Sequence, residues 1–424
     1  MKLIVHGAAN EVGRSCIELV TDDSTRFLLD AGIKLSETGT EFPLTVENPS
    51  GISAVFVSHA HLDHTGYLPL LDHNGMKCPI FATSPTKALT KILLADAFKI
   101  GRLKHQPLGY EEENIEKALS FTRRIKIDDE GSIGKAKFEY FDAGHIPGSS
   151  YIHVQVDGKR ILYTGDINTN ETRLLNGAET DYPKDVDVLI TEATYGDREH
   201  PPRQNTEKEF LNEAEETIEK GGSVLVPVFA VGRAQEIMLL LSKENLGVPV
   251  YLDGMAKEAT ELLLNYPKSI KNAAELRDAY EKVRFVKGSI QRKNIANKQG
   301  IFVTTSGMVT GGPVMDYLSK LGTDPRNSIL LTGYQGEHTN GRMLLETGSV
   351  FIDGWKTKIS ANYKQFDFSA HAGQNDLKKL IKGVNPGKLV FNHGDPGAIN
   401  ALHEWADIVD IRSYAPKIGD KITF

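Results

Sequence analysis

Short runs of β-branched and aliphatic residues recur along the chain and predict its strands. Each run is bounded by Gly, Pro, Asp or Ser, which is typical of strands that end in turns. The runs span residues 53–58, 160–164, 186–191, 223–229, 301–305, 328–332 and 388–392.

Helical periodicity lies between some of these runs. Thr206 with Glu209 matches a capping box, and Gly221 is a suitable stop signal. Between them runs an apolar stripe of Phe210, Leu211, Ala214 and Ile218. A second helix is expected after Gly232, where apolar residues are Ile237, Met238, Leu240 and Leu241. Strands that alternate with helices predict an α/β protein.

Composition narrows the class of protein. The 424 residues predict two or three domains, and 40% hydrophobic with 25% charged residues excludes a disordered chain. No apolar run is long enough to span a bilayer, and the N-terminal residues turn polar too early for a signal peptide. With only Cys16 and Cys78, we expect a reducing cytoplasm. The net charge of −7 argues against general coating of nucleic acid but leaves room for a local basic groove.

The segment HAHLDH (59–64) carries the strongest chemical signal. It places His59, His61, Asp63 and His64 on one loop after a predicted strand. Imidazole and carboxylate are good ligands for zinc and similar divalent ions. Because alternate residues at a strand end can point the same way, His59 and His61 can grip one ion, and Asp63 and His64 can face a second.

Further candidates follow other predicted strands or turns. They are His145 in DAGHIPGS, Asp166 in YTGDIN, Glu192 in TEATYG and His393 in FNHGD. Sites in open α/β sheets gather beyond the carboxyl ends of strands, so these side chains are expected to meet. A carboxylate can bridge two ions, and Asp166 is the natural bridge. Two neighbouring ions can activate water and clamp a phosphodiester.

These motifs together resemble the metallo-β-lactamase superfamily. Asp30 in LLDAG resembles its early strand-end Asp, which orients a ligand. Glu192, His371 in FSAHAG and His393 resemble the β-CASP nuclease branch. The histidine at the third of these β-CASP motifs, His393, makes the chain similar to the members of the branch that cut RNA. HAHLDHTGYLP and SAHAG are most similar to the archaeal and bacterial homologues of the cleavage and polyadenylation specificity factor nuclease.

The resemblance implies a ligand set for two Zn²⁺ ions per chain. One ion would be held by His59, His61 and His145, the other by Asp63, His64 and His393, with Asp166 shared. Glu192 and His371 would lie close together above the ions and, with Asp63, count as catalytic residues.

About 175 residues separate Glu192 from His371, which is enough for a separate domain. In the family this insertion caps the metal site and leaves a groove for a single strand. Gly-rich turns and a helix N-terminus that follow strands are candidate phosphate contacts. The candidates are Ser149, Gly232, Arg233, Ser306, Gly307, Met308, Gly336 and Arg342. Residues 284–298 hold five basic residues and no acidic one. This segment is expected to be either a solvated face or part of the RNA path.

The resulting prediction is an αββα metallo-β-lactamase sandwich (1–200 and 366–424) with an inserted α/β β-CASP cap (201–365). The expected activity is zinc-dependent hydrolysis of single-stranded RNA, endonucleolytic, in mRNA 3′-end processing or RNA turnover. A 5′-to-3′ exonuclease of the RNase J kind, a non-catalytic RNA-processing subunit and a small-ester hydrolase are the alternatives. No membrane partner is expected, and a homodimer or an RNA-processing complex is left open. The C-terminal KITF (421–424) is expected to be either a core strand or part of a dimer contact.

Overall fold

The computed structural model describes residues 1–36 and 39–424, which form two compact units. Unit 1 comprises Met1–Glu171, Gly177–Glu199 and Ala370–Phe424, and unit 2 comprises Thr172–Asn176 and His200–Ser369. All seven strands predicted from the apolar runs are present, although several begin or end a residue or two inside the predicted range. No helix in the described part of the chain is long and apolar enough to cross a membrane.

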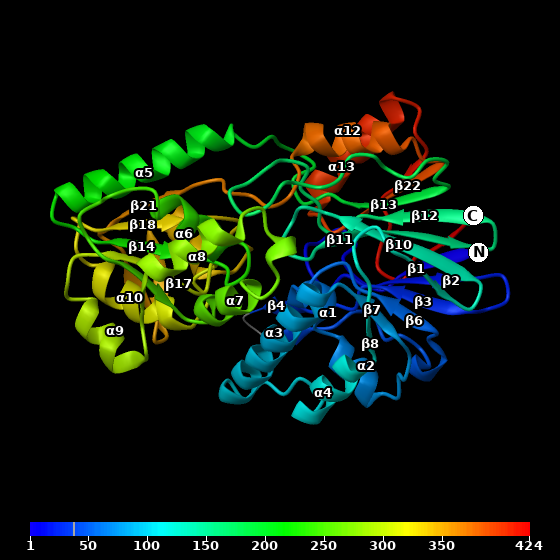
Figure 1. The fold of residues 1–424 in the computed structure, drawn as a ribbon, viewed down its shortest axis with the longest axis horizontal. Coiled ribbons are helices and arrows are strands. Elements are labelled where there is room, and N and C mark those ends of the chain that lie inside the picture. Colours follow the sequence, from blue (N-terminus) through cyan, green and yellow to red (C-terminus); the bar gives the residue numbers. More distant parts are fainter. Residues whose placement is uncertain (37–38) are drawn as a thin grey trace. The chain divides into compact units, whose positions relative to one another are not determined.

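Unit 1 contains two mixed sheets packed face to face (Figure 1). The first sheet has the order β24-β1-β2-β3-β6-β7-β8, and the second has the order β23-β22-β13-β12-β11-β10-β9. The first comprises β1 (Lys2–Val5), β2 (Ile17–Val20), β3 (Arg26–Leu29), β6 (Ala54–Phe56), β7 (Ile80–Ala82), β8 (Thr122–Arg124) and β24 (Lys421–Thr423). The second comprises β9 (Glu130–Ile133), β10 (Ala136–Asp142), β11 (Ser150–Val156), β12 (Lys159–Tyr163), β13 (Val188–Glu192), β22 (Lys388–Asn392) and β23 (Ser413–Tyr414).

Alternation of apolar residues builds the layers of unit 1. Phe56 of the first sheet and Phe138 of the second meet in the inner core, with ring centroids 4.9 Å apart. A second apolar cluster packs α12 and α13 on the outside of the second sheet, and a third lies outside the first sheet. The helices are α1 (Leu62–Thr65), α2 (Leu68–His73), α3 (Ser84–Leu103), α4 (Glu112–Ser120), α12 (Gln374–Val384) and α13 (Pro396–Ile408). The small pair β4 (Lys34–Ser36) and β5 (Gly39–Glu41) and the 3₁₀ turn η1 (Pro49–Gly51) complete an αββα sandwich.

Both termini of the chain contribute to the first sheet. Strand β24 pairs antiparallel with β1, and Leu3 lies opposite Ile422. Of the two alternatives for the C-terminal KITF, the structure therefore shows a core strand.

Unit 2 has one parallel sheet with helices on both faces. The sheet order is β16-β15-β17-β14-β18-β21, with strands β14 (Val224–Pro227), β15 (Val250–Asp253), β16 (Arg284–Phe285), β17 (Ile301–Thr304), β18 (Ser328–Leu331) and β21 (Asn362–Gln365). A separate hairpin is formed by β19 (Ser349–Ile352) and β20 (Trp355–Lys358). The helices are α5 (Arg203–Glu219), α6 (Arg233–Leu241), α7 (Ala256–Leu263), α8 (Ala273–Lys282), α9 (Ser289–Ile295), α10 (Pro313–Leu321) and α11 (Asn340–Thr347), with a 3₁₀ turn η2 (Pro267–Ser269).

The predicted start of the first helix is wrong. Helix α5 begins at Arg203, and Thr206 is buried within its first turns instead of capping them. Pro202 stands at the N-cap position. Because a proline has no backbone N–H, the helix does not extend to residues before it. The predicted stop is confirmed: Gly221 lies just after the helix with φ of 77°.

A short segment, Thr172–Asn176, is held in unit 2 by a buried carboxylate. Glu236 of α6 accepts the Leu174 N–H at 2.8 Å and pairs with the Arg203 guanidinium at 2.8 Å. Burial of a carboxylate is tolerated where such partners surround it. The sequence pattern does not indicate this connection.

Candidate metal and catalytic centre

The strands of unit 1 bring the predicted ligands together at one edge. His59 follows β6, Asp166 follows β12 and His393 follows β22, while His145 lies in the β10–β11 loop. Strands β12, β13 and β22 are parallel neighbours, so their carboxyl ends fall side by side. Three groups of donor atoms result, and Asp166 belongs to all of them. The first is His59–His61–His145–Asp166, the second is Asp63–His64–Asp166–His393, and the third is Asp166–Glu192–His371.

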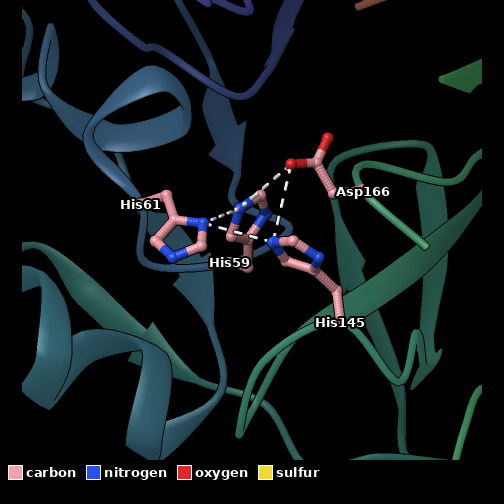
Figure 2. A group of neighbouring side chains, drawn as sticks. All are labelled: His59, His61, His145 and Asp166. Carbon is pink, nitrogen blue, oxygen red and sulfur yellow. Dashed lines mark hydrogen bonds and ion pairs between the residues drawn. The ribbon is translucent and has the colours of Figure 1, made fainter. Parts of the chain in front are cut away.

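The first group surrounds a small space with ligand atoms (Figure 2). His61 Nδ1 lies 3.1 Å from His59 Nε2 and 3.2 Å from His145 Nε2. Asp166 Oδ2 lies 3.6 Å from the Nε2 atoms of both His59 and His145. The two histidines are buried, and burial with the neighbouring imidazoles lowers their pKa well below the ordinary value. Neutral imidazoles that face one another and a carboxylate form a donor set suited to a divalent metal ion.

The second group shares Asp166 through its other oxygen. Asp166 Oδ1 lies 3.3 Å from His64 Nε2 and 3.2 Å from His393 Nδ1, and Asp63 Oδ2 lies 3.3 Å from His393 Nε2. Burial opposes ionisation of Asp166, but His393, His64 and His371 outweigh it and hold the pKa well below the ordinary value. A single charged carboxylate thus faces both donor groups, as the bridging interpretation requires.

The α1 loop owes its position to close backbone packing. A Cβ at Gly32 would lie 1.7 Å from the Asp63 carbonyl oxygen, so only glycine allows this approach. The Ala31 N–H donates to the His64 carbonyl at 2.8 Å, which fixes the same turn.

Asp30 orients His64 from behind. Its Oδ2 lies 2.7 Å from His64 Nδ1, so Nδ1 carries the proton and Nε2 faces the second donor group. Ser58 donates to Asp30 through its N–H at 2.7 Å and its hydroxyl at 2.6 Å. His145 is oriented in the same way, because its Nδ1 lies 2.7 Å from the Ala370 carbonyl oxygen.

Tyr163 is a member of this arrangement that the sequence did not reveal. Its hydroxyl donates to Asp30 Oδ2 at 2.7 Å and lies 3.0 Å from Ser15 Oγ. A polar tip on the last residue of the apolar run RILY is the signal that could have identified it. The pairing with Asp30 becomes visible only when the two sheets are stacked.

His371 and Glu192 form a separate pair beside Asp166. His371 Nδ1 lies 2.9 Å from Glu192 Oε2, and Glu192 Oε1 also accepts the Ile167 N–H at 2.7 Å. Burial opposes the charged imidazolium, but Glu192 and Asp166 outweigh it and raise the pKa of His371 to about 9. The imidazole ring of His371 lies 4.5 Å from that of His145, so the pair stands next to the first donor group.

Comparison with known proteins places these features in a family. Residues 19–193 match the family described as a metallo-beta-lactamase superfamily domain, residues 234–344 match the Beta-Casp domain, and residues 356–416 match a Zn-dependent metallo-hydrolase RNA specificity domain. The chain is 42% identical over 428 residues to a protein of Methanocaldococcus jannaschii named "Probable RNase MJ4", with all of both chains covered.

The chain belongs to the β-CASP branch of the metallo-β-lactamase superfamily. It is also 36% identical to "RNase aCSPSF2" of Saccharolobus solfataricus, over 99% of this chain and 85% of that protein. A ribonuclease of Thermus thermophilus is 32% identical, with 95% of each chain covered. Among solved structures, a protein of unknown function from Enterococcus faecalis V583 has a TM-score of 0.62 at 16% identity and covers 100% of this chain and 99% of that chain, which shows the shared fold.

The β-CASP unit gathers some of the predicted phosphate contacts beyond its own strands. Gly307 packs against the Phe229 backbone, since a Cβ there would lie 2.9 Å from the Phe229 nitrogen. Gly232 precedes α6, and its N–H donates to Gln235 Oε1 at 2.7 Å. Arg233 is largely buried and lies 6.0 Å from the centre of the Phe368 ring. Met308 and Gly336 are adjacent, because a Cβ on Gly336 would lie 3.4 Å from the Met308 sulfur.

Other predicted contacts have partners within the chain. Ser149 is buried in unit 1, where its hydroxyl accepts the His145 N–H at 3.0 Å and the Ile146 N–H at 3.2 Å. Ser306 donates to the Gly311 carbonyl at 3.2 Å, and Arg342 pairs with Glu346 at 2.5 Å. The two hydrogen bonds that Ser149 accepts give it a role in shaping the His145 loop.

The basic segment 284–298 is divided between structure and surface. Arg292 binds Asp253 through two nitrogens, at 2.6 and 3.1 Å, and reaches Asp316 at 2.6 Å. The other four basic residues, Arg284, Lys287, Lys293 and Lys298, are exposed.

Proposed function

We propose that this protein is a metal-dependent ribonuclease that hydrolyses phosphodiester bonds of single-stranded RNA by endonucleolytic cleavage. The observation that carries the proposal is the pair of donor groups that share Asp166, with His371 and Glu192 alongside. The relatives named as ribonucleases match along nearly the whole chain, which supports RNA as the substrate.

The proposed ligands divide as the donor atoms do. His59, His61 and His145 would hold one zinc ion and Asp63, His64 and His393 the other, with Asp166 between them. When bound, two such ions activate water and neutralise charge that develops on the phosphate. Asp30 and the Ala370 carbonyl keep His64 and His145 in the tautomers that present Nε2 to the ions.

His371 is proposed as the general acid. Cleavage expels an alkoxide, which leaves more readily if it is protonated as it departs. The Glu192 carboxylate holds the proton of His371 Nδ1 and favours the imidazolium, so the imidazole can deliver a proton from its other nitrogen. When the bond between phosphorus and the 3′-oxygen breaks, one product carries a 5′-phosphate and the other a 3′-hydroxyl.

The unit 2 contacts are proposed to bind RNA away from the scissile bond. Arg233, Gly307 and Gly336 lie near the carboxyl ends of parallel strands, where anions are commonly bound. The protein is proposed to act in the cytoplasm, in mRNA 3′-end processing or RNA turnover. The 201–365 insertion is proposed as the cap domain of this enzyme.

Incubation with a circular RNA tests the mode of cleavage. An endonuclease opens the circle, and product mapping on RNA labelled at either end then shows internal cuts. Cleavage of linear RNA alone, with release of successive 5′-nucleotides, would establish the 5′-to-3′ exonuclease instead. Intact RNA in both forms with metal-loaded protein would favour a non-catalytic RNA-processing subunit.

A further inference from the structure

The exposed aromatic side chains of unit 2 are concentrated in one short stretch. Among the described residues, three large aromatic side chains are exposed: Phe351 at 46%, Trp355 at 78% and Tyr363 at 38%. All three lie within the 13 residues from 351 to 363, on β19, β20 and β21. Single exposed apolar residues are common on protein surfaces, but clustered ones mark interaction sites.

The hairpin that carries two of these rings has a fixed backbone. Asp353 and Gly354 both have positive φ, which is the turn type that suits a tight two-residue hairpin. The Asn340 side chain donates to the Phe351 carbonyl at 2.9 Å and accepts the Phe351 N–H at 2.7 Å. Val350 is fully buried in the core of unit 2. The backbone is therefore anchored to α11 and the core while the rings of Phe351 and Trp355 face solvent.

Phe351 and Trp355 occupy opposite faces near the hairpin tip. Phe351 lies opposite Lys356 in the strand register, and Trp355 lies opposite Ile352. The hydroxyl of Tyr363 lies beside Gly348, the residue that precedes β19, so the third ring stands at the base of the same hairpin.

The charge around these rings is positive although the chain as a whole is acidic. Residues 349–365 contain Lys356, Lys358 and Lys364 against a single acid, Asp353, whereas the whole chain has a net charge of −7. Lys356 and Lys358 are exposed on the hairpin itself. Lys364 points elsewhere, because it pairs with Glu209 of α5 at 3.3 Å.

We propose that the β19–β20 hairpin is an accessory contact for single-stranded RNA, in which bases stack on Trp355 and Phe351 and Lys356 and Lys358 bind the adjacent phosphates. This inference rests on the proposed function, because RNA is its ligand. Single-stranded nucleic acids are bound without sequence preference by aromatic platforms within basic surfaces. Phe351 shares its face of the hairpin with Lys356 and Lys358, and Trp355 lies on the other face near the tip. Exposed rings beside two exposed lysines fit this chemistry better than a self-association interface, which needs roughly 800 Å² of matching surface on each partner.

Trp355 itself reports on stacking. The chain has two tryptophans, so Trp405→Phe leaves Trp355 as the sole indole emitter. The metal-loaded protein is titrated with a nuclease-resistant phosphorothioate oligoribonucleotide and with an abasic strand of the same length. Stacking predicts quenching by the first strand and much weaker quenching by the second. Equal quenching by both strands, or no quenching by either, would overturn the proposal. It would also be overturned if Trp355 emission and the sedimentation coefficient changed with protein concentration in the absence of RNA, because the hairpin would then be a self-association surface.

Affinity measurements then separate the hairpin from the rest of the protein. Trp355→Ala should weaken binding of the intact strand by about 5- to 150-fold, the range found when one stacking partner is removed, and should leave the affinity for the abasic strand unchanged. Ile408→Ala is the matched control, since Ile408 is an 81% exposed apolar side chain in unit 1. If the Trp355→Ala protein binds the intact strand as tightly as the Ile408→Ala control does, the inference is wrong. If that same protein still cleaves RNA normally, the proposed function is unaffected. A wild-type protein that neither binds nor cuts RNA overturns the proposed function first.

Discussion

The carboxylate of Glu192 receives His371 with both of its oxygens, at 3.0 Å for Oε1 and 2.9 Å for Oε2 from Nδ1. Glu192 is fully buried at the end of β13, whereas His371 comes from the segment before α12, 179 residues further along the chain. The pair forms a third donor group with Asp166, and the two four-residue groups are complete without it. This arrangement suits a proton donor and leads to the first two predictions.

His371→Ala should retain the metal ions and RNA affinity but lose roughly 10²–10⁴-fold in kcat, the usual contribution of a general acid. The loss should shrink on a nitrophenyl phosphodiester, whose leaving group departs without a proton. Steady-state kinetics on both substrates measure the difference. Equal losses on the two would assign His371 to positioning of the phosphate or support of the metal site.

Glu192→Gln should shift the alkaline limb of the pH profile to lower pH. The folded protein raises the pKa of His371 to about 9 despite burial, so the proton is held at neutral pH and lost as the pH rises through that value. Removal of the Glu192 charge lowers this pKa, and the active form is then lost earlier. The profile of kcat/KM against pH for RNA checks this, and an unmoved alkaline limb would remove Glu192 from the acid's environment.

Asp166→Asn should weaken both metal sites at once. A neutral amide cannot balance two cations, and Asp166 faces both donor groups. We expect about two zinc ions per wild-type chain by metal analysis after dialysis, fewer in the variant, and a loss of activity of several orders of magnitude. Near-normal metal content and turnover in the variant would exclude the bridging role.

Tyr163→Phe should accelerate metal loss without removing a ligand. The change deletes one hydrogen bond to Asp30, which holds His64, and substitutions behind metal ligands typically cost about 10–100-fold in metal affinity. The rate of zinc transfer to a chromogenic chelator measures the effect. Tyr140→Phe is the control, because that buried hydroxyl donates to the Phe81 carbonyl at 2.9 Å instead. Identical transfer rates in the two variants would contradict the role assigned to Tyr163.

Arg233→Ala should raise KM for RNA and increase the dependence on chain length modestly, with the metal count unchanged. A phosphate contact remote from the scissile bond contributes uniform binding, which appears in KM rather than kcat. Because Arg233 is largely buried, the melting temperature is compared alongside. Arg326→Ala, at an exposed arginine paired with Asp324, is the control. An unchanged KM would leave Arg233 with a structural role.

Local sequence predicted the strands and the residues at their ends, because both depend on short-range patterns. The run VDVLIT predicted β13, and HAHLDH supplied four of the clustered donors. Long-range packing was not visible in the same way. Thr206 resembles a helix cap but is buried inside α5, and Tyr163 reaches Asp30 across 133 residues of chain. Residues that meet only because two sheets stack have no characteristic separation in the sequence, so a local pattern cannot reveal them.

The order of strands also has a consequence for synthesis of the chain. Domains generally fold as units during translation, with the N-terminal one first. Here the second sheet of unit 1 lacks β22 and β23, and the first lacks β24, until residues beyond Ser369 are made, whereas unit 2 ends at that residue. On the ribosome, the inserted unit is therefore the one that can fold first. His393 follows β22, so the second donor group is assembled only after the whole of unit 2 has been made.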